Sequence, residues 1–271
     1  MIQRPKILVF DSGLGGLTVF SALQALRPEA DYTYIADDVA FPYGGLAEDV
    51  LMARVGAVME AMIARVQPDC VVIACHTAST LVLPPLRARW PHLPFVGTVP
   101  AIKTGAEQSR SGLFSVLATP GTVARDYTLD LIRQFAGHCK VNLVGSRLLA
   151  GFAERFMQGE ALDDAAVKAE IAPAFIEESG GRTDVIVLAC THYPLLLAQL
   201  KRLSPWDVAW IDPGPAIARR ADHLLREMGF AGGGAGGSAQ FMFASGRKPV
   251  DALWQALESR GFERWLQGSV P

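Results

Sequence analysis

The amino-acid sequence predicts an α/β protein built on two mostly parallel sheets. Apolar runs suited to strands alternate with helical stretches along the chain, which is typical of βαβ units. A length of 271 residues is enough for one large or two smaller domains. Two near-copies of one segment, Cys70–Thr77 and Val185–His192, each end an apolar β-branched run with Ala-Cys. Together with the length, these copies favour two sheets that face each other.

The predicted strands are short apolar runs bounded by turn residues. They are Ile7–Phe10, Tyr32–Ala36, Cys70–Ala74, Phe95–Val96, Phe114–Ala118, Val141–Val144, Val185–Ala189, Trp210–Ile211 and the late strand Gln240–Ala244. Helices are expected at Leu46–Val66, Val123–Phe135, Ala165–Glu178, Ala216–Met228 and Val250–Ser259. The glycine-rich segment Ala231–Ser238 is predicted to be a flexible surface loop, since no Gly-Lys-Ser/Thr follows it to make a phosphate loop.

Composition excludes several classes of protein. Half of the residues are hydrophobic and 19% are charged, which is typical of a globular protein with a large core. The formal net charge is −2 and no long basic run occurs, so we expect no nucleic acid partner. Met1–Pro5 carry no signal segment, and no apolar run approaches the roughly 20 residues that span a bilayer, so we expect no membrane association.

The four cysteines do not resemble a disulfide framework, so a reducing cytoplasm is the expected compartment. Cys75 and His76 are adjacent, and Cys190 is close to His192, but neither Cys-x-x-Cys nor His-x-x-x-His occurs. We therefore expect no metal.

Two of these cysteines, Cys75 and Cys190, stand where parallel strands end, which is where α/β sheets place ligands. One thiol from each half of the chain suits a site that moves a proton from one face of a carbon to the other. Thr77, Ser79 and Thr80 are cap-type residues ahead of an apolar helix, whose N-terminus is expected to lower the pKa of Cys75. The alternative is that these cysteines are small buried hydrophobes, as Cys70 and Cys139 are expected to be.

Other polar segments also follow predicted strands. Asp11-Ser12-Gly13-Leu14-Gly15-Gly16 opens a helix, and its glycines would let the backbone approach a ligand closely; alternatively, Asp11 and Ser12 are only turn or cap residues. Pro42-Tyr43-Gly44 is either a turn that holds a backbone N–H and a phenol toward a cleft or an ordinary loop. Thr119-Pro120-Gly121-Thr122 is a further candidate for an anion-binding helix terminus. His192 either orients or deprotonates a group near Cys190 or caps the helix that Pro194 begins.

Five of these segments together resemble the glutamate racemases, members of the cofactor-independent aspartate/glutamate racemase family. They occur in the family's order and cover essentially the whole chain: Asp11-Ser12-Gly13-x-Gly15-Gly16, Pro42-Tyr43-Gly44, Cys75-x-Thr77-Ala78-Ser79, Ala118-Thr119-Pro120-Gly121-Thr122 and Cys190-Thr191-His192-Tyr193-Pro194. The resemblance implies two similar α/β domains with the active site in the cleft between them. By analogy, residues 1–100 plus 211–271 form one domain and residues 101–210 the other.

The implied reaction interconverts L- and D-glutamate without a cofactor and supplies D-glutamate for peptidoglycan. Cys75 and Cys190 would be the two bases, with Asp11 assisting the first, His192 assisting the second, and Glu154 as a further acid near the second. Substrate contacts are implied for Ser12, Pro42, Tyr43, Gly44, His76, Thr77, Thr119, Thr122 and Thr191. A homodimer is expected as well.

The chain departs from the family pattern at two places. His76 stands where the family usually has Asn, so the substrate contact of that Asn is replaced or altered. Gly145-Ser146-Arg147 replaces a Cys-Pro that often precedes the region of Glu154. The alternatives that stay open are a racemase for aspartate or another amino acid, a hydrolase with one Cys-His pair, and a binding protein without catalysis.

Overall fold

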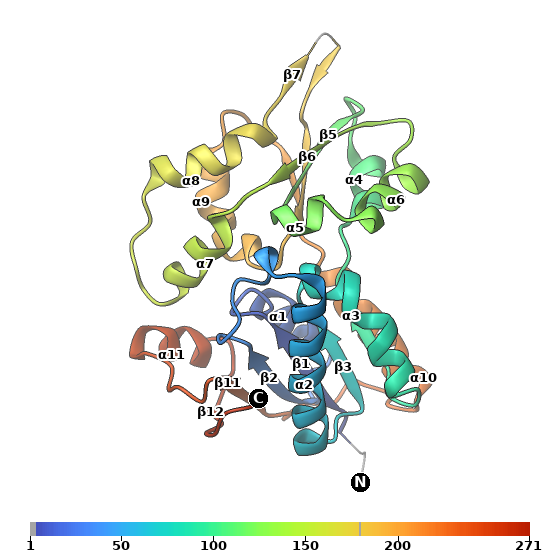
Figure 1. Ribbon diagram of the computed structural model, residues 1–271, viewed down its shortest axis with the longest axis vertical. Helices are drawn as coiled ribbons and strands as arrows, with labels where there is room; N and C mark the ends of the chain where they lie inside the picture. The colour runs from blue at the N-terminus through green and yellow to red at the C-terminus, as the bar shows by residue number, and fades with distance from the viewer. Residues whose placement is uncertain (1–3, 179) are drawn as a thin grey trace.

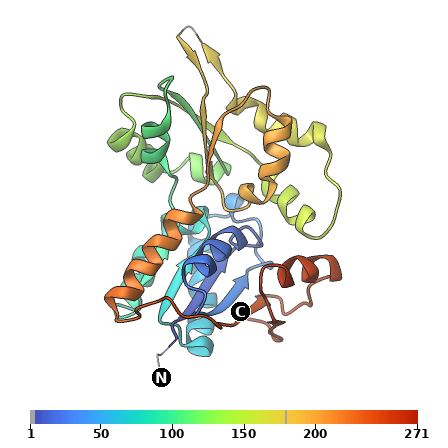
Figure 2. The same cartoon turned by 180° about the vertical axis from the view of Figure 1, so that it is seen from behind.

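The computed structural model of the protein describes residues 4–178 and 180–271 and places them in two lobes, one above the other in Figure 1. Met1–Gln3, which belong to the segment that was expected to carry no signal, lie outside the described residues. The chain passes to the second lobe after Gly97 and returns after Ile211. Both ends of the described chain lie in the first lobe (Figures 1 and 2).

Each lobe is built on one parallel sheet. The six-stranded sheet has the order β12-β11-β2-β1-β3-β4 and the four-stranded sheet the order β10-β9-β5-β6, with all pairs parallel. The strands are β1 (Lys6–Asp11), β2 (Asp31–Ala36), β3 (Cys70–Ile73), β4 (Phe95–Gly97), β5 (Leu113–Ala118), β6 (Lys140–Gly145), β9 (Val185–Ala189), β10 (Ala209–Ile211), β11 (Ala239–Phe243) and β12 (Arg264–Trp265). A small antiparallel pair, β7 (Glu177–Glu178) with β8 (Gly181–Arg182), extends from the second lobe. The predicted α/β class with mostly parallel sheets is confirmed.

Helices cover both faces of each sheet. They are α1 (Leu17–Leu26), α2 (Glu48–Val66), α3 (His76–Arg89), α4 (Ile102–Gln108), α5 (Pro120–Val123), α6 (Asp126–Phe135), α7 (Leu149–Met157), α8 (Asp164–Ile171), α9 (Leu197–Leu203), α10 (Gly214–Glu227) and α11 (Asp251–Glu258), with 3₁₀ turns η1 (Tyr43–Gly45), η2 (Ala172–Ala174) and η3 (Tyr193–Leu196). In the first lobe, α1 packs against α10 on one face and α2 against α3 on the other. Since strands β3, β5 and β9 are buried along their full length, their sequences are continuous apolar runs without alternation.

The sheet registers bring the candidate residues together. Phe10 of β1 lies beside Ile73 of β3, so the polar loop after β1 adjoins the start of α3. In the second lobe Ala118 of β5 lies beside Ala189 of β9. The carboxyl ends of both sheets therefore meet between the lobes.

Two predicted helices are wrong in extent. The stretch 123–135 is interrupted, because the extended backbone at Arg125 separates α5 from α6. The stretch 165–178 stops at Ile171, because Pro173 lacks the N–H that a continuing helix needs, and the chain then forms η2 and β7. Thr77, Ser79 and Thr80 lie inside α3 rather than ahead of it, since Cys75 is the N-cap.

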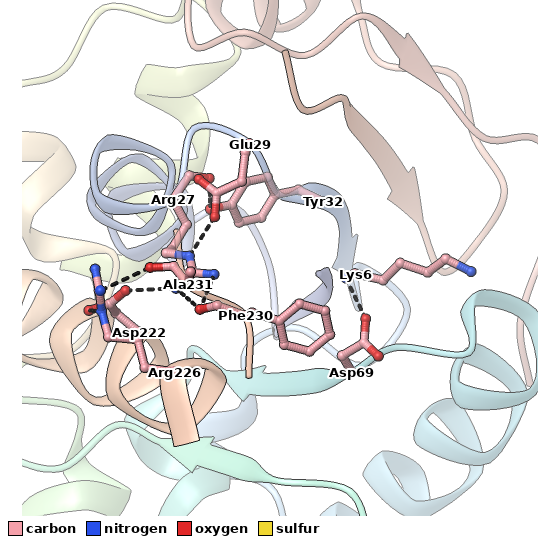
Figure 3. A network of polar contacts seen from close by, with 9 residues as sticks. All are labelled: Lys6, Arg27, Glu29, Tyr32, Asp69, Asp222, Arg226, Phe230 and Ala231. Carbon is pink, nitrogen blue, oxygen red and sulfur yellow. Dashed lines mark hydrogen bonds and ion pairs between the residues drawn. The ribbon is translucent and has the colours of Figure 1, made fainter. Parts of the chain in front are cut away.

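The glycine-rich segment 231–238 contains no helix or strand, and β11 begins directly after it at Ala239. Figure 3 shows how a buried guanidinium holds its start: Arg27 donates to the carbonyl of Phe230 (3.1 Å) and to Asp222 (3.0 Å). Arg226 donates to the carbonyl of Ala231 (2.9 Å). Because Arg27 follows α1 and precedes the start of β2, this network lies at the amino ends of the strands, opposite the ends that face the second lobe. The domain division at residues 100 and 211 stays a prediction, with Ile211 itself paired in the second sheet.

Candidate active site

The two cysteines of the repeated segment lie at the interface of the lobes. Cys75 follows β3 and caps α3, and Cys190 follows β9 of the other lobe. Their side chains are buried, at 5% and 6% exposure. Cys75 Sγ lies 3.7 Å from Ser12 Oγ, and Cys190 Sγ lies 3.9 Å from His192 Nδ1. The charge of Cys190 also acts on the pKa of Cys75, so the two thiols are within electrostatic reach of one another.

The glycines after β1 make room for side chains of the opposite lobe. A Cβ atom on Gly13 would lie 2.2 Å from Glu154 Oε1, and one on Gly15 would lie 2.3 Å from His192 Nδ1. Neither glycine has a positive φ, so close approach, and not backbone conformation, requires glycine here. The sequence predicted that the backbone at these glycines approaches a ligand closely. The structure shows that it closely approaches side chains of the second lobe.

His192 lies between a carboxylate of the first lobe and a carboxylate of its own lobe. Its Nε2 lies 2.8 Å from Glu154 Oε1 and 4.0 Å from Asp11 Oδ2. The same Glu154 oxygen accepts the backbone N–H of Leu14 at 2.5 Å. Burial acts to lower the pKa of His192, but hydrogen bonds to Cys190 and Glu154 and the charge of Asp11 outweigh it, so its pKa is raised well above the usual value. This direction favours the protonated imidazole.

Asp11 is fully buried at the end of β1. Its carboxylate accepts the N–H of Gly13 (3.1 Å) and the hydroxyl of Thr191 (3.2 Å) from the other lobe. Burial raises its pKa, and the charge of His192 opposes that effect. These contacts bind the loop after β1 to the segment after β9.

Three threonines form a second contact between the lobes. Thr77 Oγ1 of α3 lies 3.1 Å from Thr119 Oγ1 and 3.4 Å from Thr122 Oγ1, and the latter two are 3.0 Å apart. Thr119 also caps α5 by accepting the N–H of Thr122. Hydroxyl groups can turn to donate or accept, so this cluster suits an anionic oxygen.

Comparison with known proteins agrees with this arrangement. The model of the Asp/Glu/hydantoin racemase family matches residues 19–221. Glutamate racemase of Brucella anthropi is 56% identical over 224 residues, which is 83% of this chain and 80% of that protein. Glutamate racemase of Escherichia coli, solved in complex with L-glutamate and activator UDP-MurNAc-ala, superposes with a TM-score of 0.89 at 36% identity, over 99% of this chain and 100% of that one.

The chain belongs to the Asp/Glu/hydantoin racemase family. The resemblance seen in the five sequence motifs is thus confirmed, and the protein is an isomerase of this family. The parts that single residues take in the reaction stay predictions.

The expected direction of the pKa shift of Cys75 is wrong. The helix N-terminus was expected to lower the pKa of Cys75, but burial raises it, and the charge of Asp11 adds to that. The N–H of Ala78 and the hydroxyl of Ser12 pull in the opposite direction and are outweighed. Removing the thiolate from water raises its free energy by more than the helix N-terminus lowers it. Cys75 is therefore a neutral thiol in this closed arrangement.

The phenol of Tyr43 does not point freely into a cleft. It is buried and donates a hydrogen bond to Asp37, which also forms an ion pair with Arg54 (2.5 Å). Pro42 precedes η1, and Gly44 lies against Thr119, at 3.1 Å for an added Cβ. Asp37 was not among the residues expected at the site; the signal that could have found it is a carboxylate that directly follows β2.

His76 is buried at the first residue of α3. Among the described residues, neither of its ring nitrogens has a hydrogen-bond partner. Burial lowers the pKa of His76 to about 3 and outweighs the backbone of Val99, which acts in the other direction. The ring is therefore neutral, which removes the charge that would have repelled a substrate ammonium group.

Within residues 4–178 and 180–271, no group of three or more His, Cys, Asp or Glu side chains is placed to hold a metal ion. In the same part of the chain, no helix is long and apolar enough to cross a membrane.

Proposed function

We propose that this protein is a glutamate racemase that interconverts L- and D-glutamate by proton transfer between two thiols. The observation that carries the proposal is the pairing of Cys75 and Cys190, one from each lobe, each with its own polar partner in a buried site. Relatives that are 56% identical and bear this name support the choice of glutamate over aspartate.

In the proposed mechanism the thiolate of Cys75 removes the α-proton of D-glutamate. The C–H bond breaks, its electron pair stays on the substrate as a carbanion, and the S–H bond of Cys190 breaks as that thiol delivers a proton to the opposite face. Starting from L-glutamate, the two residues exchange roles. His192, whose Nδ1 lies 3.9 Å from Cys190 Sγ, assists proton transfer at that thiol, and Glu154 orients the imidazolium through a hydrogen bond to Nε2. Asp11 and Ser12 stand beside Cys75.

Fixed dipoles in a water-free site would stabilise the carbanion. The hydroxyls of Thr77, Thr119 and Thr122, with Thr191 nearby, would bind the carboxylates, and the backbone of Pro42–Gly44 would complete the contacts. His76 would contribute a neutral ring in place of the usual Asn. An incoming ammonium group near Cys75 favours its thiolate and so opposes the effect of burial.

The test is proton NMR of the protein in D₂O with L-glutamate and, separately, D-glutamate, with no added cofactor. Loss of the α-proton signal from both enantiomers, with optical activity decaying to zero, is expected. Cys75→Ser and Cys190→Ser should each cripple turnover of both enantiomers, while Cys139→Ser should not. Exchange of aspartate alone would retain the mechanism and overturn the substrate. If either Cys75→Ser or Cys190→Ser kept the activity of the Cys139→Ser control, the reaction would need only one of the two cysteines.

We propose further that the enzyme works as a homodimer in the cytoplasm and supplies D-glutamate for peptidoglycan. Four free cysteines suit a reducing compartment. Rescue of a bacterial strain that requires D-glutamate, and the molecular mass by light scattering, test the biological function and the assembly. Failure of rescue by an active enzyme would contradict the peptidoglycan assignment.

A further inference from the structure

A cavity of about 530 Å³ opens on one side of the cluster around His192. We call it the vestibule; it is lined by both lobes, among them Gly13 and Pro42 of the first and Glu154 of the second. These three residues also belong to the candidate active site. The vestibule therefore adjoins a site whose two thiols are almost fully buried.

Glu154 stands between the vestibule and the reacting groups. Its side chain is 13% exposed, whereas that of His192 behind it is 2% exposed. The ring of Phe41, which also lines the vestibule, packs against His192 with centroids 5.4 Å apart. A substrate that reaches the thiols from this side must pass Glu154 and Phe41.

The vestibule carries an excess of positive charge. Three arginines and two carboxylates line it. Asp38 pairs with Arg247 at 2.8 Å, and Glu154 pairs with His192. Arg155 forms a long ion pair with Glu160, 4.0 Å from its Nε, and both side chains are half exposed, so the pair is weak. The Arg147 side chain makes no hydrogen bond or ion pair with any residue in the described ranges. Both arginines are exposed to solvent.

We propose that the vestibule is the access route of the substrate, and that Arg147 and Arg155 attract anionic amino acids into it. The inference rests on the proposed function, because glutamate carries a net charge of −1 and would be favoured at this opening over a neutral amino acid. Clefts lined by one sign of charge raise the association rate of oppositely charged ligands, and salt weakens the effect. Both arginines would act before the reaction and touch no reacting atom.

The first test measures access without measuring racemisation. Iodoacetate and iodoacetamide alkylate thiols by the same displacement of iodide, but only iodoacetate is an anion. Peptide mapping gives the alkylation rates of Cys75 and Cys190 separately, apart from Cys139. In the double variant Arg147→Gln/Arg155→Gln, the ratio of the iodoacetate rate to the iodoacetamide rate should fall about 3- to 10-fold at low salt. The matched control is Arg133→Gln, an exposed arginine of α6 on the other side of the second lobe.

The second test blocks the route. Gly151 of α7 lines the vestibule, and a Cβ atom there meets nothing within 4 Å, so Gly151→Trp can fill the opening without a clash at Cβ. It should slow both reagents by a similar factor. Gly56→Trp, at an equally open helical glycine of α2, should not. An unchanged rate ratio in the arginine variant, or unchanged rates in Gly151→Trp, would overturn the proposal.

Racemisation assays then separate this inference from the proposed function. In an active racemase, the arginine variant should lower kcat/KM for glutamate about 3- to 10-fold at low salt, with kcat unchanged and with a weaker dependence on salt. A wild-type protein that does not racemise glutamate but shows the predicted alkylation ratios retains the vestibule and loses the proposed function. If the protein racemises glutamate but its alkylation ratio is the same in wild type and in the arginine variant, the proposed function stands and the vestibule proposal fails.

Discussion

Glu154 Oε1 lies 2.8 Å from His192 Nε2, and the same oxygen accepts the backbone N–H of Leu14 in the opposite lobe. One carboxylate therefore orients the imidazolium beside Cys190 and joins the two lobes. The sequence placed Glu154 near the second cysteine only by resemblance; the structure adds the contact to the first lobe.

Replacing Glu154 by Gln should slow the reaction and shift its pH dependence. A charge-assisted hydrogen bond contributes about 1.5–3 kcal/mol, so kcat should fall about 10- to 100-fold. Because Glu154 helps to raise the pKa of His192, its loss lowers that pKa, and activity should decline at a lower pH on the alkaline side. Glu107→Gln, at an exposed position of α4, is the control. Identical pH profiles in wild type and Glu154→Gln would show that the pair has no part in proton transfer.

Adding one methyl group to Gly13 should separate the lobes. The Cβ of Gly13→Ala would overlap Glu154 Oε1, so either the Leu14 contact or the closed arrangement must give way. A displacement of about 1 Å in a catalytic arrangement costs about 100-fold, and kcat/KM should drop by that order. Gly45→Ala, where the added atom meets nothing within 4 Å, should retain full activity. Equal activity of the two variants would contradict a close-approach role for Gly13.

Thr122→Val should weaken substrate binding more than turnover. It removes one hydroxyl from the cluster with Thr77 and Thr119 and keeps the shape of the side chain. Losing one such bond should raise KM about 10-fold with little change in kcat. The control is Thr104→Val in α4, and steady-state kinetics with both enantiomers is the measurement. An unchanged KM would remove these hydroxyls from the substrate contacts.

His76 should make the protein sensitive to acid. Its folded pKa of about 3 lies below the unfolded value near 6.5, so as the pH falls below 6.5 the unfolded chain takes up a proton that the folded protein refuses. Between pH 7 and pH 5, wild type should lose about 2 kcal/mol more free energy of unfolding than His76→Asn. Urea titrations at the two pH values measure this, with exposed His138→Asn as the control. Parallel losses in wild type and His76→Asn would mean that His76 is not buried in the folded protein.

Much of the fold follows from local patterns. The strand Val185–Ala189 is found at its predicted limits, because a buried parallel strand is a continuous apolar run that the sequence shows directly. Helix limits were harder: the break between α5 and α6 depends on the extended backbone at Arg125, which no local signal marks. Pro173 did mark the end of α8, but the apolar pattern of the following residues still favoured a longer helix.

By itself, the sequence determined the α/β class, the positions of Cys75 and Cys190 at strand ends, and the motifs shared with the racemases, because these depend on short stretches of chain. Only the tertiary structure decided that Gly13 makes room for Glu154 and that Cys75 is held as a neutral thiol. Both depend on groups that are far apart in the chain: desolvation and charge at a buried atom come from everything packed around it, and the opposite lobe supplies much of that packing.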